Sequence, residues 1–99
     1  MNKQHLRKVH SIQTNVAIIK QIAAQELQHG SSQARKHAIE SFYSSVTLHA
    51  QKLGLAVPRL GTFYQPEEYI VNCDSMLTQI EQKYGTEALA PESKKERGA

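Results

Sequence analysis

The sequence has no tryptophan, one cysteine, three prolines and five glycines, and aromatic residues make up 6% of its 99 residues. The lone cysteine, Cys73, excludes an internal disulfide, which favours a reducing compartment. No apolar run approaches the roughly 20 residues that cross a bilayer, which argues against a transmembrane helix. The first residues lack the apolar core and cleavage site of a signal peptide. We therefore expect a cytoplasmic protein that makes no contact with a membrane.

The chain has few residues that break helices. In three stretches apolar residues recur every three or four positions, which predicts amphipathic helices near 3–28, 32–53 and 66–84. The three apolar stripes are Leu6, Val9, Ile12, Val16, Ile19 and Ala23, then Ile39, Phe42, Val46, His49 and Leu53, then Ile70, Cys73, Leu77, Ile80 and Tyr84. Leu27 widens the first stripe. Gly30, Gly54 and Gly85 follow the three stretches as helix caps would.

A chain of this length forms one domain, and three such stripes pack best against one another. We predict an all-α antiparallel three-helix bundle over residues 1–85. The three stripes can close on themselves in up-down-up order, or they can leave one side open so that two copies complete a larger bundle. The sequence from residue 86 to 99 is small, charged and without periodicity, which predicts a disordered tail.

The connection between the second and third helices, residues 54–65, is long and unusually apolar. Connections run over the surface and are usually polar. This segment therefore either covers an open end of the bundle or presents its side chains to a partner. The residues predicted to bind a partner are Leu55, Val57, Arg59, Leu60, Phe63 and Tyr64.

The net charge of +3 is unevenly distributed, with +6 over residues 1–59 and −3 over residues 60–99. The two parts can simply complement each other, or the basic part can meet an acidic partner such as nucleic acid. Residues 50–64 weakly match a helix-turn-helix pattern, with Arg59 on the second helix. The cations predicted for that alternative are Lys3, Arg7, Lys8, Lys52 and Arg59.

No motif for catalysis, metal or cofactor stands out. None of the five histidines pairs with another at the spacing that places two ligands on one helix face. Cys73 lies on a core stripe and is interpreted as a small apolar residue with a high thiol pKa. We therefore predict no catalytic residues, no metal and no cofactor.

By elimination, the sequence predicts a small non-enzymatic interaction module, of the adaptor, chaperone-like or regulatory kind. It would bury an apolar surface against a protein partner or a second copy in a homodimer. The alternative is a nucleic-acid-binding regulator that uses the basic end of the first helix.

Overall fold

The computed structural model describes residues 3–89. Three α-helices, α1 (Lys3–His29), α2 (Gln33–Lys52) and α3 (Pro66–Tyr84), are followed by a short 3-10 helix, η1 (Thr86–Ala88). The predicted all-α three-helix bundle is confirmed, and its helices begin and end within one residue of the predicted bounds. Residues 86–88, which were predicted to belong to the disordered tail, form η1 instead, and Ala88 is buried. Residues 90–99 lie outside the described part of the chain.

A tight turn joins α1 to α2. Gly30 adopts φ +87° and its N–H donates to the Glu26 carbonyl at 2.9 Å, which closes the last turn of α1. Ser32 is the N-cap of α2, since its hydroxyl accepts from the Arg35 N–H at 3.1 Å. So short a connection makes α1 and α2 antiparallel neighbours.

The end of α2 redirects the chain. The Gly54 N–H donates to the Gln51 carbonyl and the Leu55 N–H to the Ala50 carbonyl, the bonding pattern of a Schellman cap. That cap needs a left-handed residue, and Gly54 supplies it with φ +77°. The carbonyl of Leu53 accepts from the Lys83 ammonium at 2.7 Å. The end of α2 is thereby tied to the end of α3.

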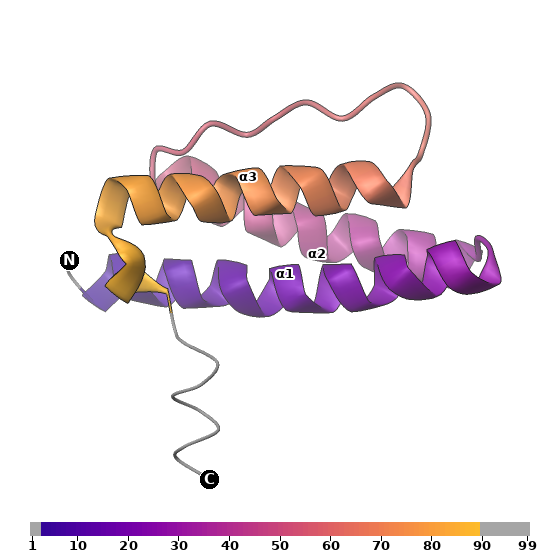
Figure 1. The fold of residues 1–99 in the computed structure, drawn as a ribbon, viewed down its shortest axis with the longest axis horizontal. Helices are drawn as coiled ribbons and strands as arrows, with labels where there is room; N and C mark the ends of the chain where they lie inside the picture. The colour runs from indigo at the N-terminus through magenta and orange to yellow at the C-terminus, as the bar shows by residue number, and fades with distance from the viewer. Residues whose placement is uncertain (1–2, 90–99) are drawn as a thin grey trace, which may run out of the picture.

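Residues 54–65, here called the strap, cross the bundle from one end to the other (Figure 1). A fully extended segment of twelve residues reaches about 40 Å, more than the roughly 28 Å of a 19-residue helix. The strap therefore returns the chain to the end where α1 finishes before α3 starts. As a result α3 runs parallel to α2, and both run antiparallel to α1 (Figure 1). This differs from the simple up-down-up order in which the three stripes can close, and the length of the strap is the reason.

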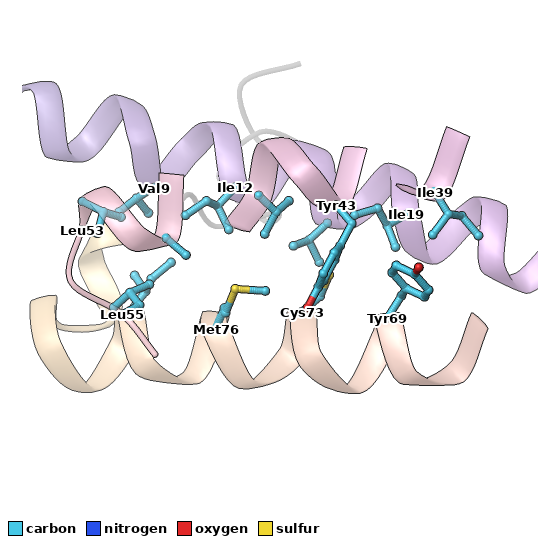
Figure 2. Close-up of a cluster of buried hydrophobic side chains, with 14 of the residues drawn as sticks. Val9, Ile12, Ile19, Ile39, Tyr43, Leu53, Leu55, Tyr69, Cys73 and Met76 are labelled. Carbon is cyan, nitrogen blue, oxygen red and sulfur yellow. The ribbon is translucent and has the colours of Figure 1, made fainter. Parts of the chain in front are cut away.

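One apolar seam runs along the bundle, and Figure 2 shows side chains of all three helices and Leu55 of the strap meeting in it. The largest fully buried side chains are Val9, Ile12, Ile19, Ile39, Val46, Cys73, Met76 and Ile80. Complete burial of such a side chain contributes about 1.5–3 kcal/mol. The seam is therefore the main source of stability.

The buried face of α2 keeps Ile39, Val46 and Leu53 of the predicted stripe but differs at two positions. Tyr43 and Ala50 are buried, whereas Phe42 and His49, which were predicted to face the core, are half-buried. Neighbouring positions on a helix differ by only about 100° around its axis, so spacing alone did not separate them. The hydroxyl of Tyr43 accepts a hydrogen bond from the Asn72 amide at 3.2 Å, which satisfies the buried tyrosine.

Candidate functional site

Side chains of α3 hold the backbone of the first part of the strap in place, and the strap itself forms no helix or strand. Their hydrogen bonds join Gln79 to Ala56, Asn72 to Pro58 and Glu68 to Gly61. Gln79 both accepts from the Ala56 N–H and donates to the Ala56 carbonyl, each at 2.8 Å. Successive strap residues meet progressively earlier residues of α3. The strap therefore runs antiparallel to α3 and takes its course from polar side chains.

The far end of the strap is held by a carboxylate buried in the last turn of α1. Glu26 is 4% exposed and accepts the Tyr64 hydroxyl at 2.8 Å and the Arg35 Nε at 2.8 Å. It also accepts the Ser32 N–H at 2.9 Å and the Ser31 hydroxyl at 3.2 Å. We call these five residues the Glu26 cluster. The cluster joins the end of α1, the start of α2 and the strap.

The same contacts set the charge of the cluster. Burial by itself raises the pKa of Glu26, but the hydrogen bonds from Tyr64, Arg35, Ser32 and Ser31 outweigh burial and lower that pKa from 4.5 to about 2. Burial and the adjoining carboxylate raise the pKa of Tyr64, so its hydroxyl remains a donor. Glu26 is therefore ionised at neutral pH and acts as a permanent acceptor for the strap.

We did not predict from the sequence that Glu26 is buried, although its position in the chain indicates burial. The steps of three and four through Ile19 and Ala23 lead directly to Glu26, which is buried, whereas Leu27 is 52% exposed. The apolar character of Leu27 predicts that it widens the stripe, but this side chain faces solvent. A charged residue in a core position next to a turn rich in serine indicates a cluster of this kind.

The strap divides the six residues predicted to bind a partner into two groups. Leu55 is buried, and Val57 and Tyr64 are half-buried against the core. The exposed group is Arg59, Leu60 and Phe63. The segment therefore covers the bundle with one group of side chains and presents the other group to solvent.

Three exposed apolar side chains lie on the strap and on the first turns of α3. Phe63 is 78%, Val71 64% and Leu60 37% exposed. Leu60 and Phe63 line one surface hollow and Val71 lines another, and Glu68 belongs to both. We call Leu60, Phe63 and Val71 the tip surface. Val71 was not among the residues predicted to bind a partner. Its position outside the apolar stripe of α3 nevertheless indicates that it is exposed.

The structure separates the cations predicted for nucleic acid. Four of them lie at the end of the bundle where α1 begins and α2 ends, namely Lys3, Arg7, Lys8 and Lys52. Arg59 lies beside the first turns of α3, in the surface hollow that contains Glu67 and Val71. Arg59 thus lies near the start of α3 and does not extend the basic group.

The helix-turn-helix interpretation of residues 50–64 is wrong. No helix follows α2 within this stretch, and residues 55–65 have no regular secondary structure. Pro58 lacks a backbone donor and Gly61 disfavours a helix. The strap backbone bonds to side chains of α3 instead.

Over residues 3–89, no three histidine, cysteine, aspartate or glutamate side chains gather as ligands for a metal ion. Cys73 is fully buried, and burial raises the pKa of its thiol to about 12. A thiol of that pKa is protonated at neutral pH and is a poor nucleophile.

Compared with known proteins, the chain matches no family model, no curated protein and no solved structure. In the described part of the chain, none of the helices combines the length and the apolar character needed to cross a membrane.

Proposed function

We propose that the protein is a small interaction module that binds another protein, or a second copy of itself, through the tip surface. The observation that carries this proposal is the exposure of Phe63, which is 78% accessible and lines a surface hollow with Leu60. Aromatic side chains of this kind dominate the energy of protein interfaces. Covering one such ring contributes about 1.5–3 kcal/mol to association. The adaptor, chaperone-like or regulatory roles predicted from the sequence all use such a surface.

The backbone behind the tip surface is already ordered. Gly61 donates to the Glu68 carboxylate at 3.0 Å, and Tyr64, next to Phe63, is bonded to Glu26. A partner therefore does not have to order this segment when it binds, which reduces the entropic cost of association. Arg59 and Glu67 lie around the apolar residues as the polar rim of an interface does.

The first test is the solution mass by light scattering of the wild type and of Phe63→Ala. We expect the wild type to self-associate and the variant to be monomeric, with the same helical content by circular dichroism. Because Phe63 is exposed, its loss changes the free energy of unfolding by less than about 0.5 kcal/mol.

Leu48→Ala is the matched control, because Leu48 is 51% exposed on α2 and lies outside the tip surface. Self-association that survives Phe63→Ala would contradict a role for the tip surface. A monomeric wild type would direct the search to a different protein partner, with the same pair of variants as probes.

A second candidate function rests on the four cations at the end of the bundle where α1 begins. None of Lys3, Arg7, Lys8 and Lys52 forms an ion pair within residues 3–89. Such a group can hold phosphates without reading sequence.

Adding a short DNA duplex at about 50 and 500 mM salt separates the two functions, because phosphate contacts weaken steeply with salt and apolar burial does not. A complex at low salt that is lost on charge reversal of Arg7 and Lys8 would favour the second candidate.

A further inference from the structure

A surface hollow of about 200 Å³ opens beside the tip surface. Leu60 and Phe63 form part of its wall, and Glu40 of α2 and Glu68 of α3 contribute carboxylates. The volume is below the roughly 300–1,000 Å³ of typical small-molecule sites. The hollow is therefore of a size to receive one side chain of a partner.

Tyr69 supplies an unused polar group to this hollow. The residue is 6% exposed and lines the hollow, and residues 3–89 make no hydrogen bond to its hydroxyl. Because no fully buried side-chain oxygen in this part of the chain lacks a partner, the Tyr69 hydroxyl is open to solvent. Its neighbour Tyr43, by contrast, is bonded to Asn72. A tyrosine hydroxyl can accept a hydrogen bond, so a donor that enters the hollow can replace solvent at Tyr69.

The charges around the hollow favour a cation. Burial raises the pKa of Tyr69, and the negative charge of Glu40 is the largest contribution after burial, with Glu68 adding to it. One ammonium opposes these two carboxylates, that of Lys36, which lies 5.3 Å from the centroid of the Tyr64 ring. That distance lies within the range of a cation–π contact. An aromatic face in this hollow thus already meets a cation of the chain itself.

We propose that the hollow receives the guanidinium of an arginine side chain of the partner protein, an inference that rests on the proposed function. The planar guanidinium has five donors, and its donors can be shared between the Glu40 and Glu68 carboxylates and the Tyr69 hydroxyl. A lysine ammonium is more strongly hydrated and spreads its donors less widely. An apolar residue beside that arginine then covers Phe63 and Leu60. The partner segment is thus basic and apolar.

A titration followed by NMR tests this inference on the full chain. The probe is a blocked pentapeptide with arginine between two leucines, and its control has citrulline, the neutral isostere, in place of the arginine. We expect the arginine peptide to shift the amide signals of Gly61, Thr62 and Tyr69 and to bind at least about threefold more tightly than the control. The preference should decrease as salt is added.

Variants of the hollow sharpen the test. Glu40→Gln and Glu68→Gln should each remove most of the preference for arginine, and glutamine at position 68 keeps an acceptor for the Gly61 N–H. Lys36→Met should strengthen binding, since it removes the competing cation. Glu81→Gln, an exposed substitution near the other end of α3, is the control that should change nothing.

Equal binding of the two peptides would overturn the inference about the hollow and leave the tip surface as an apolar site. Shifts that are absent from the hollow, or a preference that survives both glutamine variants, would overturn it as well. Failure of the proposed function is a separate result, namely association that survives Phe63→Ala.

Discussion

The helical seam and the strap use apolar residues in different ways. In the seam, apolar residues recur with the helical period, and their side chains point into the space between the helices (Figure 2). In the strap, Tyr64 packs against the core while its neighbour Phe63 is 78% exposed. The chain bends at Thr62 and Phe63 and has no regular period there, so adjacent aromatic residues serve opposite purposes. The comparison shows that apolar character predicts burial only where a periodic element directs the side chains.

The two regions also differ in what stabilises them. The seam depends on buried apolar area, whereas the strap depends on a few hydrogen bonds from Gln79, Asn72, Glu68 and Glu26. A typical hydrogen bond contributes a net 0.5–1.5 kcal/mol, roughly half or less of a buried aliphatic side chain. Changes in the seam should therefore alter global stability, and changes in the strap should act locally.

The largest effect is expected in the seam. Ile12→Ala should lower the free energy of unfolding by about 2–5 kcal/mol, because it leaves a cavity at a fully buried position. Urea denaturation followed by circular dichroism measures the loss, and Ile12→Val should give about 0.5–1.5 kcal/mol. Leu48→Ala, at a half-exposed position on α2, is the control. Similar losses for Ile12→Ala and Leu48→Ala would mean that the seam is not the core.

An intermediate effect is expected where the strap joins the bundle. Because the folded pKa of Glu26 is lowered from 4.5 to about 2, its charge contributes stability above pH 4.5 that is lost as pH falls toward 2. Glu26→Gln removes this contribution at every pH. The wild type should therefore be more stable than the variant at neutral pH, and the difference should shrink between about pH 4.5 and 2.

Urea denaturation of both proteins across that pH range measures the difference. Glu81→Gln, on an exposed position of α3, is the matched control and should follow the wild type. A difference for Glu26→Gln that stays constant down to pH 2 would show that the carboxylate is not held ionised by the cluster.

The smallest effect is expected in the first part of the strap. Gln79→Ala removes both hydrogen bonds to Ala56 and should cost about 1 kcal/mol. Hydrogen exchange should accelerate at the Ala56 amide while the amide of buried Met76 stays protected. Gln82→Ala, at an exposed position of the same helix, should leave both amides unchanged. Equal acceleration at Ala56 and Met76 would mean that the strap and the helices open together.

Much of the fold could be predicted, because it depends on local signals. Gly30, Gly54 and Pro66 mark helix boundaries through their own backbone preferences, and the helices begin and end within one residue of the predicted bounds. The candidate site could be predicted only in part. Phe63 and Leu60 were named from the apolar strap, but the strap sequence carries no sign that Tyr64 faces inward to Glu26.

The sequence by itself determined three amphipathic helices, their limits and the apolar character of the strap, since helical periodicity and caps act within a few residues. Only the tertiary structure decided that α3 runs parallel to α2, that Glu26 is a buried acceptor and that Phe63 is exposed. Those features depend on contacts between residues far apart in the chain, such as Tyr64 with Glu26 and Asn72 with Tyr43. Hydrogen-bond partners at that separation leave no periodic trace in a single sequence.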